Sequence, residues 1–265
     1  MILLAVFGSS VSHSRSPEIH HSFARQCALK VDYQAIEARP DTFPRLVEEF
    51  AAGGGRGCNI TVPLKHEAWK LAQKSSDSSK QARAANTLLF KTQKDLFADN
   101  TDGRGLVRDL ASNLDHQLGG SRVCIIGAGG AVAGILGDLL AQGPAKLVIA
   151  NRTLARAQQL HERFASLEAI PLADLHLQDP FDLVINATSL GHHGKHPGLP
   201  PSMFHTDSLC YDLNYGAVAE PLRNFCREAE IRYQDGLGML VEQAALSFEL
   251  WTGRMPDTEL VLKQL

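Results

Sequence analysis

The sequence predicts an α/β protein of two domains, one of which contains a dinucleotide-binding unit. The chain has 265 residues, of which 44% are hydrophobic, so it is long enough for two ordinary domains with buried cores. Strand-like and helix-like segments alternate up to about residue 100, and a glycine-packed turn follows a short apolar strand at 122–126. Alternation of this kind predicts mainly parallel sheets.

The first hundred residues are expected to form one α/β domain. Expected strands are 3–8, 31–38, 57–62, 86–91 and 95–99; expected helices are 17–29 and 41–52, with two more around Glu67 and Gln81. A polar turn at 92–94 joins the last two strands, so at least one antiparallel pair is expected. The serine-rich segment 75–80 is expected to cap a helix.

A dinucleotide-binding unit is predicted at 122–153. Its first strand is followed by Gly127, Gly129 and Gly130, which leave backbone amides open to a pyrophosphate at the start of the next helix. That helix is expected to begin near Ala131 and to end before Gly143. The strict pattern has glycine or alanine at position 132, where this chain has Val132. The flanking strands and helix support the assignment nevertheless.

The second strand of this unit indicates which dinucleotide binds. The strand, 146–150, is followed by Asn151, Arg152 and Thr153, with Arg156 one turn further on. An NAD enzyme typically has Asp or Glu here, to accept hydrogen bonds from the ribose hydroxyls. Planar guanidinium groups suit a phosphate dianion instead. The sequence therefore predicts NADP.

Helix 103–115 leads into this unit, which continues through strands near 182–186 and 208–212, and two helices close the chain. The penultimate helix, 239–251, reads as amphipathic. Glu242 and Glu249 mark the expected solvent side; the expected buried track is Leu240, Ala244, Ser247 and Trp251. This terminal pair is expected to pack back on the first domain.

Composition excludes several classes of partner. The formal charge of −3 is spread without a basic run, which argues against nucleic acid and favours a small soluble ligand. No apolar stretch is long enough to span a membrane, and the first residues turn polar too soon for a secretory signal. We therefore expect a cytoplasmic protein.

Neither cysteines nor histidines predict a metal site. The five cysteines are widely spaced and never form a CxxC pair, so neither a disulfide framework nor a thiolate site is indicated. Cys124 and Cys210 fall in predicted strands and read as small core residues. His192, His193 and His196 gather in a loop rich in glycine and proline. Because no acidic or cysteine ligand is nearby, no metal is expected there.

Two charged residues are candidates for catalysis. Lys65 falls at the N-terminal edge of a predicted helix, where the helix dipole disfavours a cation; the alternative is an ordinary surface lysine. Asp102 precedes another helix, where it could serve as a plain N-cap or as a catalytic carboxylate.

Several polar residues could bind a substrate. Ser14 and Ser16 stand at a helix entrance with Pro17, where hydroxyls and amides suit a carboxylate, although a serine cap explains the same residues. Thr61 and Asn86 could be hydrogen-bonding groups at strand ends. Gln243 shares a helix face with apolar residues, and a polyhydroxylated substrate could satisfy its buried amide.

Over nearly its whole length the chain resembles the shikimate dehydrogenase family. The resemblance rests on motifs whose order and spacing are specific: SHSRSP (12–17), NITVPLK (59–65), AANTL (84–88), DNTDG (99–103), GAGGA (127–131), NRT (151–153), NATSLG (186–191), YDLNY (211–215) and DGLGMLVEQAA (235–245). It implies a substrate-binding and catalytic domain of mixed-sheet α/β structure, 1–102 plus 238–265. It also implies a Rossmann-type NADP-binding domain, 103–237, with the active site in the cleft between the two.

The resemblance implies reversible, NADPH-dependent reduction of 3-dehydroshikimate to shikimate in aromatic amino-acid biosynthesis, by a cytoplasmic monomer or homodimer. Carried over by motif, Lys65 and Asp102 are the catalytic pair. The implied substrate-binding residues are Ser14, Ser16, Thr61, Asn86, Tyr215 and Gln243. The implied cofactor-binding residues are Gly127, Ala128, Gly129, Gly130, Ala131, Asn151, Arg152, Thr153, Arg156, Gly236 and Met239.

The chain departs from the family pattern at Val132-Ala133, at Ala84 and at Glu220-Pro221, which affects cofactor and loop details but not the catalytic pair. Two alternatives stay open. One is a quinate/shikimate dehydrogenase relative that uses NAD, which the arginines after Asn151 disfavour. The other is a non-catalytic NADPH-binding sensor, which would be favoured by loss of Lys65 or Asp102.

Overall fold

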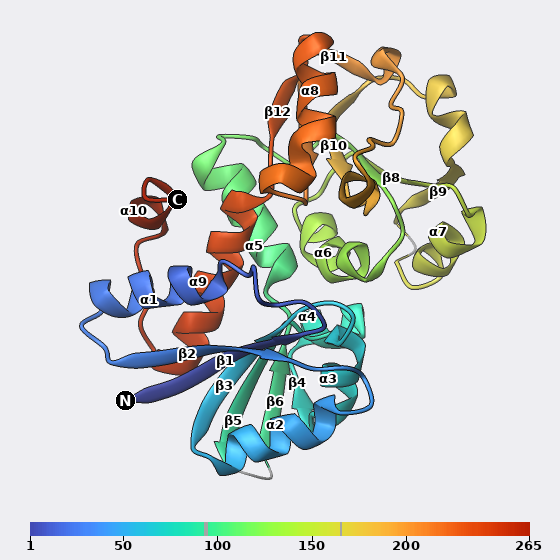
Figure 1. Cartoon of the computed structure of the whole chain (residues 1–265). Helices are drawn as coiled ribbons and strands as arrows, with labels where there is room; N and C mark the ends of the chain where they lie inside the picture. The colour runs from blue at the N-terminus through green and yellow to red at the C-terminus, as the bar shows by residue number, and fades with distance from the viewer. Residues whose placement is uncertain (93–94, 165) are drawn as a thin grey trace. The chain divides into compact units, whose positions relative to one another are not determined.

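The computed structural model describes residues 1–92, 95–164 and 166–265 (Figure 1). The chain forms two compact units, one comprising Met1–Leu106 with Leu240–Leu265 and the other Val107–Met239. The polar turn predicted at 92–94 falls largely on residues 93 and 94, which lie outside the described residues. The predicted α/β class is confirmed for both units.

The first unit is built on a mixed six-stranded sheet with the strand order β2-β1-β3-β5-β6-β4. Its strands are β1 (Ile2–Gly8), β2 (Val31–Glu37), β3 (Gly55–Ile60), β4 (Lys74–Ser75), β5 (Thr87–Thr92) and β6 (Asp95–Asp99). Strand β5 runs antiparallel to both β3 and β6, whereas the other described pairs are parallel. This is the antiparallel pairing that the hairpin predicted.

Helices cover both faces of this sheet. They are α1 (Ser16–Gln26), α2 (Phe43–Ala52), α3 (Lys65–Leu71), α4 (Asp77–Ala82), α9 (Leu237–Thr252) and α10 (Thr258–Leu262). Helix α2 lies on one face and α1 on the other (Figure 1). The predicted serine cap is present, because the Ser76 side chain accepts a hydrogen bond from the Ser79 amide at the start of α4. The helix predicted at 103–115 is α5 (Asp102–Arg108), which continues as a π-helical turn, η1 (Asp109–Asn113).

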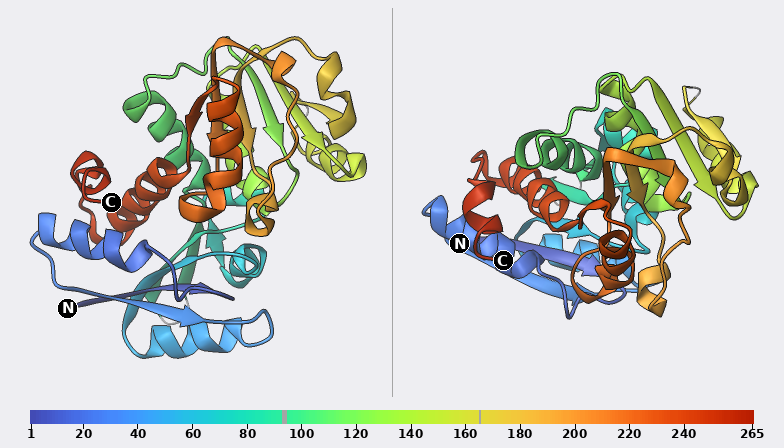
Figure 2. Two further views of the ribbon diagram at one scale, coloured as in Figure 1. Left: turned by 45° about the horizontal axis from the view of Figure 1, so that its top comes forward. Right: turned by 90° about the horizontal axis from the view of Figure 1, so that it is seen from above.

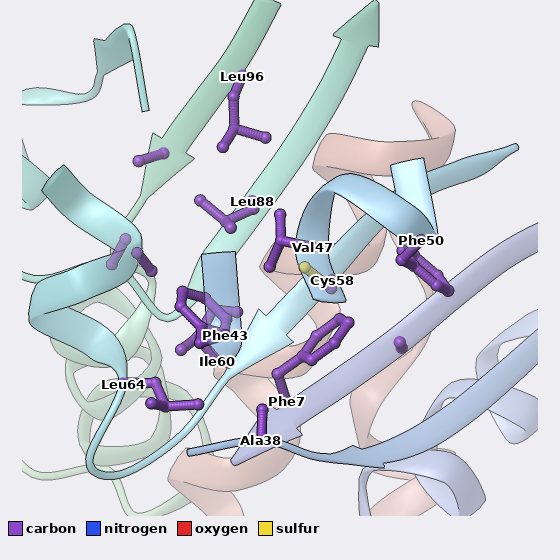
Figure 3. Close-up of a cluster of buried hydrophobic side chains, with 14 of the residues drawn as sticks. Phe7, Ala38, Phe43, Val47, Phe50, Cys58, Ile60, Leu64, Leu88 and Leu96 are labelled. Carbon is purple, nitrogen blue, oxygen red and sulfur yellow. The ribbon is translucent and has the colours of Figure 1, made fainter. Parts of the chain in front are cut away.

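The core beneath α2 is aromatic and aliphatic (Figure 3). Phe7 of β1 meets Phe43 and Phe50 of α2 edge to face, with ring centroids 5.9 and 5.8 Å apart. Cys58 and Leu64 are fully buried in the same cluster. This packing fixes the end of β3 and the loop that leads to Lys65.

The solvent side predicted for α9 is wrong at one position. Glu249 is exposed, but Glu242 is only 1% exposed. Helix α9 packs on two sides: Val241 and Phe248 belong to a cluster with α1 and α10, whereas Trp251 packs with residues of the sheet. Two residues seven positions apart therefore need not both face solvent on a helix that is covered on more than one side.

The first helix ends earlier than predicted. The sequence predicts a helix over 17–29, but α1 ends at Gln26 because Ala28 takes a left-handed conformation with φ 52°. Such a stop normally carries glycine. Because Ala28 stands there instead, the sequence gives no local signal that the helix ends.

The second unit is built on a parallel sheet with the order β12-β11-β10-β7-β8-β9. Its strands are β7 (Arg122–Ile126), β8 (Lys146–Asn151), β9 (Glu168–Pro171), β10 (Phe181–Asn186), β11 (Phe204–Asp212) and β12 (Arg232–Gln234). This order matches that of doubly wound dinucleotide-binding sheets, in which the direction of winding reverses between the first and fourth strands. Those strands are β7 and β10 here, so the predicted Rossmann-type fold is confirmed.

Helices flank this second sheet. They are α6 (Gly130–Ala141), α7 (Leu154–His161) and α8 (Glu220–Glu228), with shorter helices η2 (Leu172–Leu177), η3 (Leu190–His193), η4 (Pro201–Met203) and η5 (Gly216–Ala219). Leu222 and Cys226 of α8 pack with alternate strand residues such as Cys124 and Ile126. Because α6 and α8 belong to crossovers that run in opposite directions along the sheet, right-handed connections place them on opposite faces (Figure 2).

Within the described ranges 1–92, 95–164 and 166–265, no helix has both the length and the apolar character that crossing a bilayer requires.

One histidine is part of the core of the first unit. His20 on α1 is 0% exposed and stacks on Tyr33 with ring centroids 4.4 Å apart, at an interplanar angle of 9°. Phe23 and Phe248 lie against the same imidazole. Burial lowers the pKa of His20 to about 3, because charging the ring would require removing a cation from water.

This buried histidine is expected to make the protein less stable in mild acid. The unfolded chain binds a proton at His20 below a pKa of about 6.5, whereas the folded chain binds it only near pH 3. The contribution of His20 to stability is therefore complete above pH 6.5 and is lost as pH falls toward 3. Between pH 7 and pH 5 this one group should lower the free energy of unfolding by about 2 kcal/mol. Urea unfolding of wild type and His20→Gln at both pH values would measure it, and equal pH dependence in the two proteins would contradict it.

Candidate active site and cofactor site

Lys65 and Asp102 form an ion pair within the first unit. Lys65 is the first residue of α3, as predicted, and its Nζ lies 2.5 Å from Asp102 Oδ2. The side chains are 20% and 8% exposed, so water screens the pair only partly. The Asp102 carboxylate accepts from Lys65 and Asn86, whereas the Asp102 backbone amide donates to Asn100 Oδ1 at 3.1 Å. The Asp102 carboxylate, at the start of α5, therefore forms an ion pair with the Lys65 ammonium.

Asn86 connects this pair to the buried polar groups behind it. Its Nδ2 lies 2.8 Å from both Asp102 Oδ1 and Thr101 Oγ1, and 2.9 Å from Gln243 Oε1. An amide nitrogen carries only two protons, so Asn86 cannot donate to all three oxygens at once. A substrate hydroxyl could donate to the oxygen that is left.

A glycine on α5 allows Gln243 to reach this cluster. A Cβ atom on Gly105 would lie 2.7 Å from the backbone nitrogen of Gln243, so a larger residue would push α9 away. The Gln243 side chain is also fixed by donation from its Nε2 to the Leu240 carbonyl at 2.8 Å. As predicted, Gln243 faces protein, and it is 9% exposed.

Ser14 and Ser16 lie together at the start of α1. Ser14 Oγ accepts from the Ser16 amide at 3.2 Å, and the residue at the N-cap position is Arg15, whose side chain makes no capping bond. Thr61 follows β3, and its methyl group packs where a Cβ atom on Gly8 would lie. These three residues belong to the first unit, as do Lys65, Asn86, Asp102 and Gln243.

The second unit has a pocket at the carboxyl ends of β7, β8 and β10. Its cavity volume is about 260 Å³, and its lining residues are Ile126, Gly127, Ala128, Gly129, Ala150, Asn151, Arg152, Arg156, Leu172, Ala187, Thr188, Ser189, Leu190 and Pro197. The pocket lies where the winding of the sheet reverses, the expected ligand position in such folds.

The glycines of this pocket suit a pyrophosphate. Gly127 has φ 115°, and a Cβ atom there would lie 3.1 Å from the Ala187 carbonyl oxygen. A Cβ atom on Gly129 or Gly130 would meet no protein atom within 4 Å, so protein packing does not explain these two glycines. Since α6 begins at Gly130, the open space lies over the unpaired amides of a helix N-terminus, to which Ala131 also belongs.

Two guanidinium groups line the same pocket. Arg152 and Arg156 are both exposed, and Asn151 orients the turn between them by donating from Nδ2 to the Thr153 carbonyl at 2.8 Å. Thr153 stands at the N-cap of α7 without a side-chain capping bond. Exposed guanidinium groups beside a strand end fit a 2′-phosphate.

The remaining predicted residues lie in or beside the loops that leave β11 and β12. Tyr215 is half-buried at the start of η5 and belongs to the second unit. Gly236 donates to the Asn214 carbonyl at 2.9 Å, and a Cβ atom there would lie 2.5 Å from the Leu213 carbonyl oxygen, so the loop requires glycine. Met239 is half-buried in the first turn of α9.

Comparisons with known proteins identify relatives of this chain. Family models match the chain at residues 6–88 (shikimate dehydrogenase substrate binding domain), 109–194 (shikimate / quinate 5-dehydrogenase) and 236–265 (shikimate 5′-dehydrogenase C-terminal domain). A protein of Methylococcus capsulatus named shikimate dehydrogenase (NADP(+)) is 46% identical, with 98% of this chain and 95% of the relative covered. The chain belongs to the shikimate dehydrogenase family.

Other members extend the comparison. A shikimate dehydrogenase (NADP(+)) of Dechloromonas aromatica is 46% identical over 99% of this chain and 97% of its own. The crystal structure of an Ael1 enzyme from Pseudomonas putida has a TM-score of 0.93 at 41% identity, covering 100% and 98% of the two chains. Shikimate 5-dehydrogenase from Thermus thermophilus, solved with NADP(H) and shikimate, has a TM-score of 0.85 at 32% identity, covering 98% and 96%. The resemblance read from the sequence motifs is thereby confirmed.

Two of the cysteines and one of the loop histidines pack against neighbouring groups in the second unit. Cys124 and Cys210 are buried strand residues, as predicted, and burial raises the pKa of the Cys124 thiol. His196 stacks on Phe225 with ring centroids 4.7 Å apart. Among the described residues, no group of three or more His, Cys, Asp and Glu side chains is arranged to hold a metal ion.

Some site residues were missed in the sequence. Thr101 is fully buried between Asn86 and the Gln243 carbonyl, to which its hydroxyl donates at 3.0 Å. Thr188 and Ser189 line the pocket of the second unit. Their signal was their place directly after the predicted strand 182–186, because loops at the carboxyl ends of parallel strands form the ligand crevice.

Proposed function

We propose that this chain catalyses the reversible, NADPH-dependent reduction of 3-dehydroshikimate to shikimate, a step of aromatic amino-acid biosynthesis. One observation supports this above the others: the partly buried Lys65–Asp102 pair lies beside a buried hydrogen-bonding cluster in which the Asn86 amide faces three oxygens. A polyhydroxylated substrate matches that cluster. The relatives named as NADP(+)-dependent shikimate dehydrogenases support the same reaction.

Lys65 is proposed as the group that handles the proton of the reaction. In reduction, the ketone oxygen gains negative charge, and the Lys65 ammonium stabilises that charge and donates a proton to the oxygen. Asp102 keeps the ammonium in place through its 2.5 Å contact. Bound NADPH supplies the hydride. In the reverse direction, the same nitrogen accepts the hydroxyl proton.

The remaining polar residues are proposed to orient the substrate. Ser14 and Ser16 bind its carboxylate at the entrance of α1, while Asn86, Gln243 and Thr61 bind its hydroxyls. Tyr215 is proposed to contribute from the second unit. By this assignment, unit Met1–Leu106 with Leu240–Leu265 is the substrate-binding and catalytic domain.

Unit Val107–Met239 is proposed as the NADP-binding domain. The glycines and Ala131 at the start of α6 hold the pyrophosphate, and Arg152 and Arg156 hold the 2′-phosphate together with Asn151 and Thr153. Gly236 and Met239 are proposed to contact the cofactor too. These residues fit the group because the space over Gly129 and Gly130 is open.

We further propose that the protein acts in the cytoplasm as a monomer or homodimer. The alternative of a quinate-active, NAD-using relative is disfavoured by the two arginines in the pocket. The alternative of a non-catalytic NADPH-binding sensor is disfavoured by the paired Lys65 and Asp102.

One assay separates these functions. Absorbance at the nicotinamide band would follow shikimate or quinate oxidation with NADP⁺ or NAD⁺. We expect shikimate with NADP⁺ to be the fastest of the four combinations, by about tenfold or more over either single exchange, because each exchange leaves buried or charged groups unmatched. Faster turnover of quinate with NAD⁺ would favour the first alternative. No turnover of any pair, with NADPH still bound, would favour the sensor.

A further inference from the structure

A line of buried polar side chains runs through the first unit from α1 toward the Lys65–Asp102 pair. None of them is more than 6% exposed. In order, they are His20, Tyr33, Asn59, Ser247, Thr87 and Asn86. Only Asn86 touches the pair directly, through Asp102 Oδ1 at 2.8 Å, so it is the member by which this line reaches the carboxylate.

The amide of Asn59 has one possible orientation. Its Nδ2 lies 3.2 Å from the Asn86 carbonyl oxygen and 3.1 Å from Ser247 Oγ. A backbone carbonyl can only accept, so the nitrogen must face Asn86. Asn59 Oδ1 therefore faces the other side, 2.7 Å from the Tyr33 hydroxyl and 3.1 Å from His20 Nε2.

This orientation fixes the state of His20. Because Asn59 Oδ1 can only accept, the imidazole must carry a proton on Nε2. His20 Nδ1 has no hydrogen-bond partner, and the ring is surrounded by Phe23, Tyr33 and Phe248. An aromatic hydrocarbon would pack as well here without a buried unpaired nitrogen. What histidine adds is a single donor aimed at Asn59.

From Asn59 the contacts continue to the carboxylate. Asn59 Nδ2 donates to the Asn86 backbone carbonyl. The Thr87 hydroxyl donates to Asn86 Oδ1 at 2.9 Å and also lies 2.7 Å from Ser247 Oγ. The Thr101 amide also binds Asn86 Oδ1, at 2.9 Å. With its oxygen held on two sides, Asn86 points Nδ2 at Asp102.

We propose that His20, as the neutral Nε2–H tautomer, is a positioning residue for the Lys65–Asp102 pair, acting through Asn59 and Asn86, with Tyr33 as a second donor to Asn59. The proposal rests on the function proposed above. It concerns residues that do not touch the reacting atoms.

Steady-state kinetics of three variants test whether the Nε2–H donor of His20 matters for catalysis. His20→Phe fills the same space without a donor, and His20→Gln returns an N–H near the position of Nε2. We expect His20→Phe to lower kcat/KM for shikimate about tenfold or more, because a buried acceptor loses a partner, with KM for NADP⁺ unchanged. His20→Gln should recover most of the loss, and the neighbouring His21→Phe serves as control. Equal losses in His20→Phe and His20→Gln would show that ring packing matters, and would overturn the proposal.

A double-mutant cycle tests the route. If His20 acts through Asn59 and Asn86, then Ser247→Ala disturbs the same path, and the double variant with His20→Phe should lose much less than the product of the two single losses. Additive losses would overturn the proposal. Should His20→Phe fail to fold, Tyr33→Phe takes its place in the cycle. It removes the oxygen that donates to Asn59, and because that oxygen also bonds with the Ser16 side chain, KM for shikimate is measured alongside kcat.

Nitrogen-15 NMR of the histidine rings gives a readout that does not depend on turnover. We expect His20 to show the Nε2–H tautomer at pH 7, and an Nδ1–H tautomer or an imidazolium would overturn the proposal. The two ideas fail separately. A wild-type protein that does not oxidise shikimate contradicts the proposed function, whereas an active wild type with an unimpaired His20→Phe variant overturns only this inference.

Discussion

Replacing Lys65 by alanine is expected to lower kcat for shikimate oxidation about a thousandfold. The change removes the group proposed to accept or donate the proton and the positive charge proposed to stabilise the developing oxyanion, and each such effect is typically worth about 10² to 10⁴ in rate. The variant also leaves the 8% exposed Asp102 carboxylate without its ammonium. Steady-state kinetics at saturating NADP⁺, together with fluorescence titration of NADPH, would measure the two effects separately.

NADPH affinity should stay within about twofold of wild type, because the second unit supplies the proposed cofactor residues. Lys70→Ala is a suitable control: Lys70 lies on the same helix and pairs with Glu67 at 3.3 Å on the surface, where its side chain is 54% exposed. Its removal should leave kcat unchanged. A Lys65→Ala enzyme that turns over as fast as wild type would exclude Lys65 from the mechanism.

The features that sequence predicted well have local causes. The strand, glycine turn and helix at 122–141 follow from an apolar run, glycines and an apolar helical segment within twenty residues, and they appear as β7 and α6. Lys65 falls at the start of α3 because residues on either side of the turn after β3 change from strand-like to helical character.

The features that sequence missed have distant causes. Glu242 is buried on a helix that packs on more than one side, and no pattern within α9 reveals which of its residues neighbouring elements cover. The edge strands β9 and β12 have four and three residues, too few for a periodic signal, and they exist because a neighbouring strand offers a paired edge. The Thr101 hydroxyl donates to the Gln243 backbone carbonyl although the two residues are 142 positions apart in the chain.

The second large effect is expected on the preference for NADPH over NADH. Replacing Arg152 by alanine is expected to weaken NADPH binding by about 10- to 100-fold, because a charge-assisted hydrogen bond to phosphate is worth about 1.5 to 3 kcal/mol. NADH lacks the 2′-phosphate, so its dissociation constant should change little. Titration of nicotinamide fluorescence with each reduced cofactor would give the two constants.

The assignment of Arg152 to the 2′-phosphate depends on how much more Arg152→Ala weakens NADPH binding than NADH binding. Arg156 lines the same pocket, so Arg152→Ala/Arg156→Ala should reduce the preference for NADPH further than the single change, whereas the exposed Arg227→Ala on α8 should leave it unchanged. Because the proposed phosphate recognition depends on surface-exposed guanidinium groups, the preference should also decline as salt screens them. Equal weakening of NADPH and NADH by Arg152→Ala would mean that Arg152 contacts a part common to both cofactors, and the 2′-phosphate would then have to be held by other groups in the pocket.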